Sequence, residues 1–209
     1  MNQDKQLVSF NIQNAAYAVP KSEGEGWENF VKFVSGSDSL ALDANYSEKV
    51  IYSDGLVRAT IPNDKGKTGT LTLLNIDNDY EIAMGRRMKT ANGTSEIKQR
   101  KSVEHVLYYE FEYLDENTGA TKVAKVQLYG VTSGRPSQAL NQTTDDINNN
   151  NVDLSLTIKG MTMKANTGDT DYTDANGNIV KVWQTICLPG EEGYDTFGKT
   201  VVVPKAPTV

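Results

Sequence analysis

Residues suited to nucleophilic chemistry are few in this chain of 209 residues, which has one cysteine, Cys187, and one histidine, His105. A cysteine nucleophile needs a nearby base, and a serine nucleophile needs a histidine or an equivalent group. Cys187 lies in the apolar and turn-like stretch QTICLPG, and His105 begins a strand-like run. Neither has a catalytic motif around it, so we expect a buried structural thiol, a packed or surface histidine and no catalytic residue.

Two short motifs resemble ligand sites but fail at a required position. The GKT at 66–68 matches the end of a phosphate-binding loop, yet Ile61 stands where that loop needs its first glycine. The acidic stretch 169–178 resembles a calcium loop, but the register that starts at Asp174 lacks the glycine and the glutamate of an EF-hand. We expect polar hairpin tips at both places. The sequence therefore predicts no cofactor, no metal site and no enzymatic activity.

Composition and charge narrow the class of protein. Hydrophobic residues make up 38% and charged residues 23%, values typical of a globular chain. The formal net charge of −6 and the pI of about 4.9 argue against a protein that tracks nucleic-acid phosphates. No window is apolar enough for a membrane helix, and MNQDKQLVSF lacks the apolar centre of a signal peptide. We expect synthesis in a cytoplasm and no membrane association.

The elements that would position any functional site are predicted to be mainly strands, because apolar and polar residues alternate through most of the chain. The clearest case is HVLYYEFEYLDENTGATKVAKVQLYGV, a hairpin in which Tyr109, Phe111 and Tyr113 are expected to form core. WENFVKFV is compatible with a short helix or a strand. NIDNDYEIAMGRRM predicts one helix, with Asp77 or Asp79 as its N-cap.

Two segments are predicted to lie outside the core. NDKGKTG, residues 63–69, predicts a mobile polar loop, and the tail that ends in VVVPKAPTV predicts an extended C-terminal arm. The remaining strands are short and lie at hairpin spacing, and Asp54–Gly55, a common turn pair, predicts a break between two of them. The predicted fold is therefore mainly β, a two-sheet β-sandwich or barrel with one short flanking α-helix. We expect a single β domain over residues 1–190 and the arm over 191–209.

In their order and spacing, several stretches of this sequence resemble those of the major tail proteins of long-tailed, non-contractile phages. Those proteins polymerise into the tail tube. The stretches are NAAYAVP, SLALDANYSEKVIYSDG, TGTLTLLNIDNDYEIAMG and the central YYEFEYLDENTGATKVAKVQLYGV, followed by RP and TTDD. The likeness spans most of residues 8–188. No single motif is specific, and Ser53 stands where the family's turn has alanine.

This resemblance implies a structural virion protein made in a host bacterial cytoplasm. Its partners would be copies of itself, in hexameric rings that stack into a tube, and other tail proteins at the tube ends. DNA would pass through the tube without specific binding, and an acidic wall would repel its phosphates. The assembly contacts expected from the polar loop and the arm are Asp64, Lys65, Gly66, Lys67, Thr68, Val201, Val202 and Val203.

A binding module is the alternative reading. A β-sandwich that recognises glycan or protein in a cell-surface or adhesion device would expose aromatic side chains, and Tyr108 and Tyr129 are expected to lie together on the other face of the central hairpin.

Overall fold

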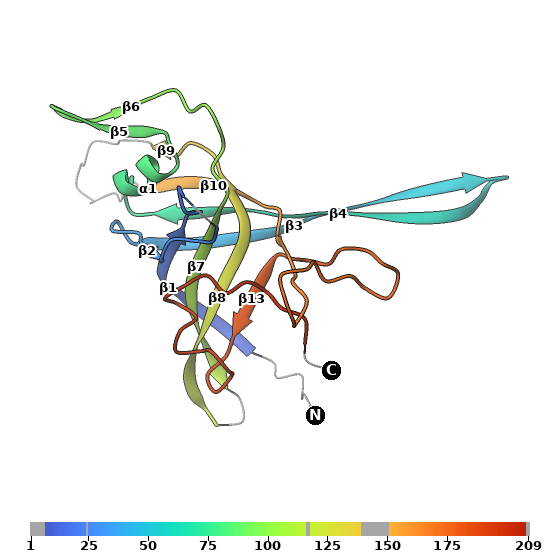
Figure 1. Ribbon diagram of the computed structural model, residues 1–209. Helices are drawn as coiled ribbons and strands as arrows, with labels where there is room; N and C mark the ends of the chain where they lie inside the picture. The colour runs from blue at the N-terminus through green and yellow to red at the C-terminus, as the bar shows by residue number, and fades with distance from the viewer. Residues whose placement is uncertain (1–6, 24, 116–117, 139–150, 208–209) are drawn as a thin grey trace, which may run out of the picture.

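The fold was analysed in a computed structural model, which describes residues 7–23, 25–115, 118–138 and 151–207. It is mainly β, with one large antiparallel sheet, two small two-stranded sheets and one short helix (Figure 1). The connector 139–150, which holds the TTDD stretch, lies outside the described residues. The predicted β class and single short helix are confirmed.

Nine strands form the large sheet, in the order β2-β1-β7-β8-β10-β4-β3, with β13 also on β8 and β9 also on β10. Their bounds are β1 (Leu7–Ala18), β2 (Val31–Lys32), β3 (Ser37–Ser53), β4 (Leu56–Leu73), β7 (His105–Asp115), β8 (Ala120–Ser133), β9 (Ser137–Gln138), β10 (Val152–Ile158) and β13 (Gln184–Cys187). The small sheets pair β5 (Arg87–Thr90) with β6 (Gly93–Glu96) and β11 (Met161–Thr162) with β12 (Lys181–Val182). The ambiguous stretch WENFVKFV is therefore a loop with the two-residue strand β2, and not a helix.

The large sheet curls around its main core. Buried residues of β1, β4, β7, β8 and β10 belong to one apolar cluster, including Tyr17, Leu71, Leu107, Leu128 and Leu154. Strands from distant places in the sheet order can share a cluster only if the sheet bends over it. The alternative of a closed barrel is wrong, because β2 and β3 end the order and do not pair with each other among the described residues.

A glycine junction lets β8 change its partner. Along one edge, β8 pairs first with β13 (Gln184↔Leu128) and then with β10 (Ile158↔Val131). Gly130, between these two pairings, has φ of 62°, a conformation that glycine adopts at little cost. A Cβ on Gly130 would collide with the carbonyl oxygen of Gly160. The bend therefore depends on two backbones that approach where no side chain intervenes.

The helix α1 (Asn78–Ala83) begins as the sequence predicts. Asp77 is its N-cap, and the Asp77 side chain accepts a hydrogen bond of 3.0 Å from the Tyr80 N–H. The second carboxylate oxygen of Asp77 accepts from the Val34 N–H at 2.7 Å, so the cap also ties the β2–β3 loop to the helix. Tyr80 packs edge-on against Tyr17, with ring centroids 4.8 Å apart, and this contact joins α1 to the core.

The central β7–β8 hairpin has buried side chains on both faces. Tyr113 is buried, and Tyr109 and Phe111 are half-buried against the main core. On the opposite face, the alternative of a binding module required Tyr108 and Tyr129 to be exposed, but they are 3% and 0% exposed. They are buried because C-terminal residues lie over this face, where Phe197 forms a second apolar cluster with Tyr108, Ala16 and Cys187.

The C-terminal segment 191–207 is part of the subunit fold, which corrects the expectation of a free arm. The buried Gln127 side-chain amide donates to the Phe197 carbonyl at 2.5 Å, and its oxygen accepts from the Val202 N–H at 3.0 Å. Tyr129 Oη donates to the Val202 carbonyl at 2.9 Å. Because buried polar groups must find partners, Gln127 and Tyr129 can be buried only with this segment in place.

We predict that Gly130→Ala lowers the free energy of unfolding by about 2–4 kcal/mol, because it adds a steric collision to the cost of a positive φ. Gly177→Ala is the matched control: Gly177 has φ of 81° but no described atom within 4 Å of an added Cβ. The control should cost only about 1 kcal/mol. Urea unfolding monitored by tryptophan fluorescence measures both. Equal losses for the two variants would contradict the proposed collision.

Candidate functional site

The outer parts of β3 and β4 form a hairpin that projects from the body of the molecule (Figure 1). Every residue from 43 to 65 is exposed. The strands pair as far as Ser53↔Leu56, and Asp54 and Gly55, with φ of 54° and 78°, make the turn that the sequence predicts. A two-stranded ribbon in water is at best marginally stable, so a hairpin of this length is expected to gain a neighbour.

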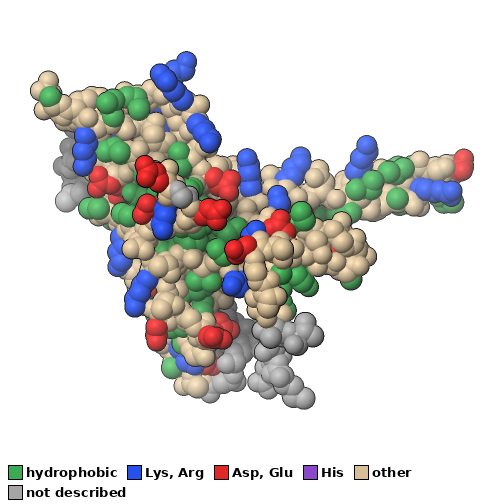
Figure 2. All heavy atoms as spheres, in the orientation of Figure 1, with side chains coloured by type: hydrophobic (Ala, Val, Ile, Leu, Met, Phe, Trp, Pro, Cys, Tyr) green, Lys and Arg blue, Asp and Glu red, His purple; other side chains and the backbone are tan. Residues whose placement is uncertain are grey.

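Apolar side chains are concentrated on this projecting hairpin (Figure 2). The exposed fractions are 73% for Leu56, 66% for Tyr52, 59% for Val57, 52% for Tyr46, 49% for Ile61, 39% for Ile51 and 38% for Val50. Val50 and Tyr52 point to one side of β3 and Ile51 to the other, since side chains alternate along a strand. Both faces are therefore apolar in part, and contiguous exposed apolar surface commonly marks an interaction site.

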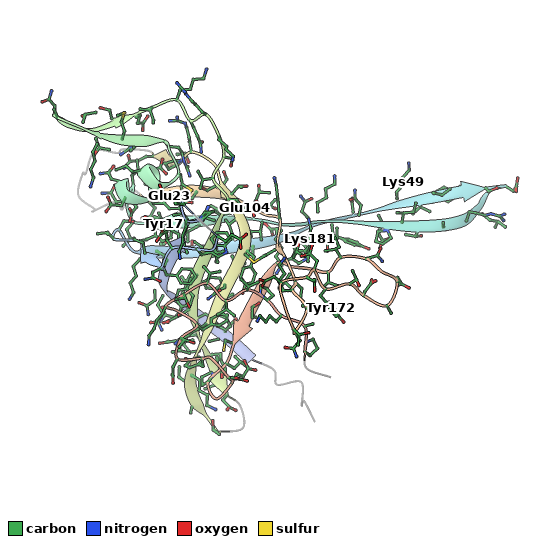
Figure 3. All side chains as sticks on the ribbon, in the orientation of Figure 1. Tyr17, Glu23, Lys49, Glu104, Tyr172 and Lys181 are labelled. Carbon is green, nitrogen blue, oxygen red and sulfur yellow. The ribbon has the colours of Figure 1, made fainter. Side chains whose placement is uncertain are left out.

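Charged residues flank the apolar ones. Lys49, labelled in Figure 3, and Arg58 are not in any ion pair among the described residues. Tyr46 donates a 2.5 Å hydrogen bond to the Glu48 carboxylate, and this bond raises the pKa of the exposed Tyr46 hydroxyl. The outer half of the hairpin thus offers an apolar surface flanked by the cations of Lys49 and Arg58, and it also carries the carboxylates of Glu48 and Asp54. The part around Arg58 suits a partner with an apolar recess and a carboxylate.

The base of the hairpin is fixed by a kink at Gly66. Ala44 pairs with Lys67 and Tyr46 pairs with Asp64, so β4 has an extra residue at this point, a β-bulge. Gly66 is buried with φ of 93°, and an added Cβ would collide with the Ile158 carbonyl and lie 3.1 Å from the Trp183 ring. The Asp64 side chain accepts from the Gly66 N–H at 2.9 Å. The predicted mobile loop 63–69 is therefore wrong: the segment is a kinked part of β4.

Trp183 packs across this kink. An added Cβ on Gly160 would lie 2.5 Å from the Trp183 ring, so the indole fits only because Gly160 and Gly66 have no side chains. Trp183 also packs against the main core. Beside it, Lys67 Nζ donates to Gln184 Oε1 at 2.7 Å. These contacts join the base of the hairpin to β10 and β13.

The residues predicted to make assembly contacts divide between two places, and no described hydrogen bond or ion pair joins the two groups. Asp64 and Lys65 are exposed at the base of the hairpin, whereas Gly66 is buried and Lys67 and Thr68 are half-buried in pairs with β10. Val201 and Val203 are half-buried, and Val202 is 37% exposed. The exposed apolar residues of the hairpin were missed. The signal for them was the adjacent apolar triplet Val50–Tyr52, which does not suit a strand with only one buried face.

His105 belongs to a buried polar cluster and not to an open cleft. Its Nε2 lies 3.1 Å from Tyr80 Oη, and Tyr80 Oη donates to Ser133 Oγ at 2.6 Å. Arg86, 1% exposed, donates to Ser133 Oγ at 2.5 Å and lies 3.3 Å from Glu81 Oε1. Burial lowers the pKa of His105 to about 4 and raises that of the Glu81 carboxyl. Arg86 Nε and Glu81 Oε1 make no hydrogen bond among the described residues, but each of the residues named here contacts another member of the cluster. These contacts support a structural role.

The remaining candidates also have structural roles. Cys187 is buried in the second apolar cluster, and burial raises the pKa of its thiol. Among the described residues, no group of histidine, cysteine, aspartate or glutamate side chains could hold a metal ion. In the calcium-like stretch, Asp174 Oδ1 accepts hydrogen bonds from the Asn176 and Asn178 N–H groups, both at 2.9 Å. Its carboxylate therefore closes a turn.

We predict that Trp183→Ala lowers the free energy of unfolding by about 3 kcal/mol, because it leaves a cavity over Gly66 and Gly160. Tyr172→Ala, which truncates a ring that is 36% exposed, is the control and should cost under about 1 kcal/mol. Thermal unfolding by circular dichroism gives both values. A loss at Trp183 no larger than that at Tyr172 would contradict the role assigned to the indole.

We also predict a pH dependence that originates at His105. The folded pKa of about 4 lies below the ordinary value of 6.5, so His105 contributes stability above pH 6.5 that is lost as the pH falls toward 4. The loss is about 3 kcal/mol. Glu81, with a raised pKa, acts in the opposite direction, so the wild type is compared with His105→Gln. The difference between their pH profiles from 7 to 4 isolates the histidine, and parallel profiles would refute the prediction.

Comparison of the chain with known proteins gives no family assignment. No protein-family model matches it, and no curated protein is similar to it. Within the part of the chain that the structure describes, no helix has the length and apolar character needed to cross a membrane.

Proposed function

We propose that this chain is a structural protein that assembles with copies of itself into hexameric rings, and that these rings stack into the tail tube of a long-tailed, non-contractile phage. The observation that carries the proposal is the projecting hairpin, whose apolar residues are exposed on both faces. A lone subunit gains nothing from such a surface, whereas an assembly buries it and gains about 25 cal/mol for each Å² of apolar area removed from water.

The sequence resemblance supplies the form of the assembly: a subunit with the sandwich-like β fold of tail tube proteins, rings of six subunits and a hollow tube in the virion. The net charge of −6 suits a conduit for DNA, because like charges repel and the genome would pass without binding. Other tail proteins would cap the ends of the tube. The alternative of a glycan- or protein-binding module loses its main support, because Tyr108 and Tyr129 are buried within the subunit.

We predict that Leu56→Glu abolishes assembly and leaves the subunit folded, because Leu56 is 73% exposed and contributes little to the core. A charge there would oppose burial of the tip by another copy. Ile179→Glu, a matched change at an apolar residue that is 56% exposed between β11 and β12, is the control. Light scattering and negative-stain microscopy should show rings or tubes for the wild type and the control only. Wild-type protein that stays monomeric across concentration and salt would overturn the proposed function.

A further inference from the structure

An apolar groove lies where the curled sheet fails to close. It has a volume of about 480 Å³ and lies between β1 and β3, with β7 as its floor. The apolar residues that line it are Phe10, Ile12, Leu40, Leu42, Tyr109 and Phe111. Phe10 is 45% exposed, and the other five are half-buried. The groove is thus an open side of the main core, and its one charged lining residue is Asp38.

The sheet does not close over this groove, because β1 is irregular there. Asn11 and Asn14 have positive φ values of 58° and 53°, and the pairing of β1 with β7 shifts at both places. Their side-chain amides donate to Glu112 at 3.2 Å and to Glu110 at 2.6 Å, which holds the two bulges in place. Within the described part of the chain, residues 7–14 of β1 pair with β7 alone, because β2 pairs only with Ala16 and Tyr17. Bulges along such an open edge hinder regular pairing with another strand. Side chains, and not a further strand, are therefore the suitable filling for the groove.

A subunit's own hairpin points away from this groove. The same strand β3 lines the groove with Leu40 and Leu42 and then leaves the body as the hairpin (Figure 1). The tip at Asp54 and Gly55 is therefore at the far end of β3 from the groove. Only a hairpin from another molecule can bring its tip to this position.

The tip and the groove match in chemistry. Tyr52, Leu56 and Val57 are the most exposed apolar residues of the hairpin, and they lie next to the cation of Arg58. The groove offers half-buried apolar side chains with the Asp38 carboxylate at its rim. Among the described residues, Asp38 accepts one hydrogen bond, of 3.3 Å, from the exposed Asn151 side chain, and a carboxylate has acceptor capacity beyond one such bond.

A second groove on the body has a different chemistry. It has a volume of about 1060 Å³, and charged residues dominate its lining, including Glu104 and Lys181, which are labelled in Figure 3. The other charged residues there are Glu25, Lys159, Lys164, Asp169, Asp171 and Lys205. An apolar tip would have to displace water from these charges without replacing its hydrogen bonds, which is unfavourable. The groove between β1 and β3 is the better receptor.

We infer that the hairpin tip of one copy, at Tyr52, Leu56 and Val57, lies in the groove between β1 and β3 of a second copy, with Arg58 toward Asp38. This inference rests on the proposed function and adds the receptor surface to it. Donor and receptor are different surfaces, so the contact is head-to-tail, and every copy both provides a tip and receives one. Such a contact extends until a ring or a tube is complete.

A mixing experiment with two variants tests this contact. Leu56→Glu disables the tip and keeps the groove, whereas Phe10→Glu disables the groove and keeps the tip. Each variant alone should remain monomeric, because neither can make the head-to-tail contact with itself. An equimolar mixture should give a heterodimer, since one intact tip meets one intact groove. Analytical ultracentrifugation measures all three samples, and circular dichroism checks that both variants are folded.

The outcomes separate this inference from the proposed function. If Phe10→Glu assembles like the wild type while Leu56→Glu does not, or if the mixture of folded variants stays monomeric, the groove is not the receptor and self-assembly still stands. If the wild type does not assemble, both ideas fail.

Cross-linking covers the case in which Phe10→Glu does not fold. In a Cys187→Ala background, the double variant Phe10→Cys, Leu56→Cys should form chains of disulfide-linked subunits on oxidation. Either single variant should stop at covalent dimers. Double-variant protein that also stops at dimers would overturn the inference.

Discussion

The close approach of backbones at Gly66, Gly130 and Gly160 is the constraint on which the rest of the structure depends, and the ring of Trp183 packs over Gly66 and Gly160. Gly130 and Gly160 meet where β8 leaves β13 and joins β10. Gly66 meets the Ile158 carbonyl where β4 leaves β10 and becomes the hairpin. A side chain at any of the three would push these strands apart. The same junction therefore sets the curl of the sheet and the exit of the hairpin.

Buried polar residues lie beside both apolar clusters, and they bind different parts of the chain in each. In the main core, Arg86 donates to the Gly134 carbonyl and lies with its guanidinium 5.6 Å from the Tyr80 ring centroid. This buried cation connects the end of α1 with the end of β8. On the other face, Gln127 binds the backbone of the C-terminal segment in place of an apolar contact. Buried polar groups of this kind specify one arrangement, because any shift would leave them without partners.

Local patterns in the sequence were sufficient for the class of fold, for a helix capped by Asp77 or Asp79 and for the turn at Asp54 and Gly55. Each of these depends on residues close together in the chain. The kink at Gly66 was misread, because the polar and glycine-rich NDKGKTG has the composition of a loop and its function as a bulge depends on Ile158 and Trp183, far away in sequence. The burial of Tyr108 was missed for the same reason, since Phe197 covers it. The exposure of the apolar hairpin could not be predicted from the alternation of apolar and polar residues. Alternation indicates which side chains share a face of a strand, but it does not indicate whether another element covers that face.

The C-terminal segment also orders events during synthesis. Gln127 and Tyr129 are made more than seventy residues before Val202, with which they bond at sequence separations of 75 and 73. A nascent chain therefore leaves this face of the sheet uncovered until Val202 has been synthesised, because contacts between distant residues form only when both are available. The hairpin and the groove between β1 and β3 belong to a subunit in which the β8 face is covered only after residues 191–207 are added. A chain cut short by premature termination would lack the cover over Tyr108 and Gln127, and it would be a substrate for proteolysis before it could enter an assembly.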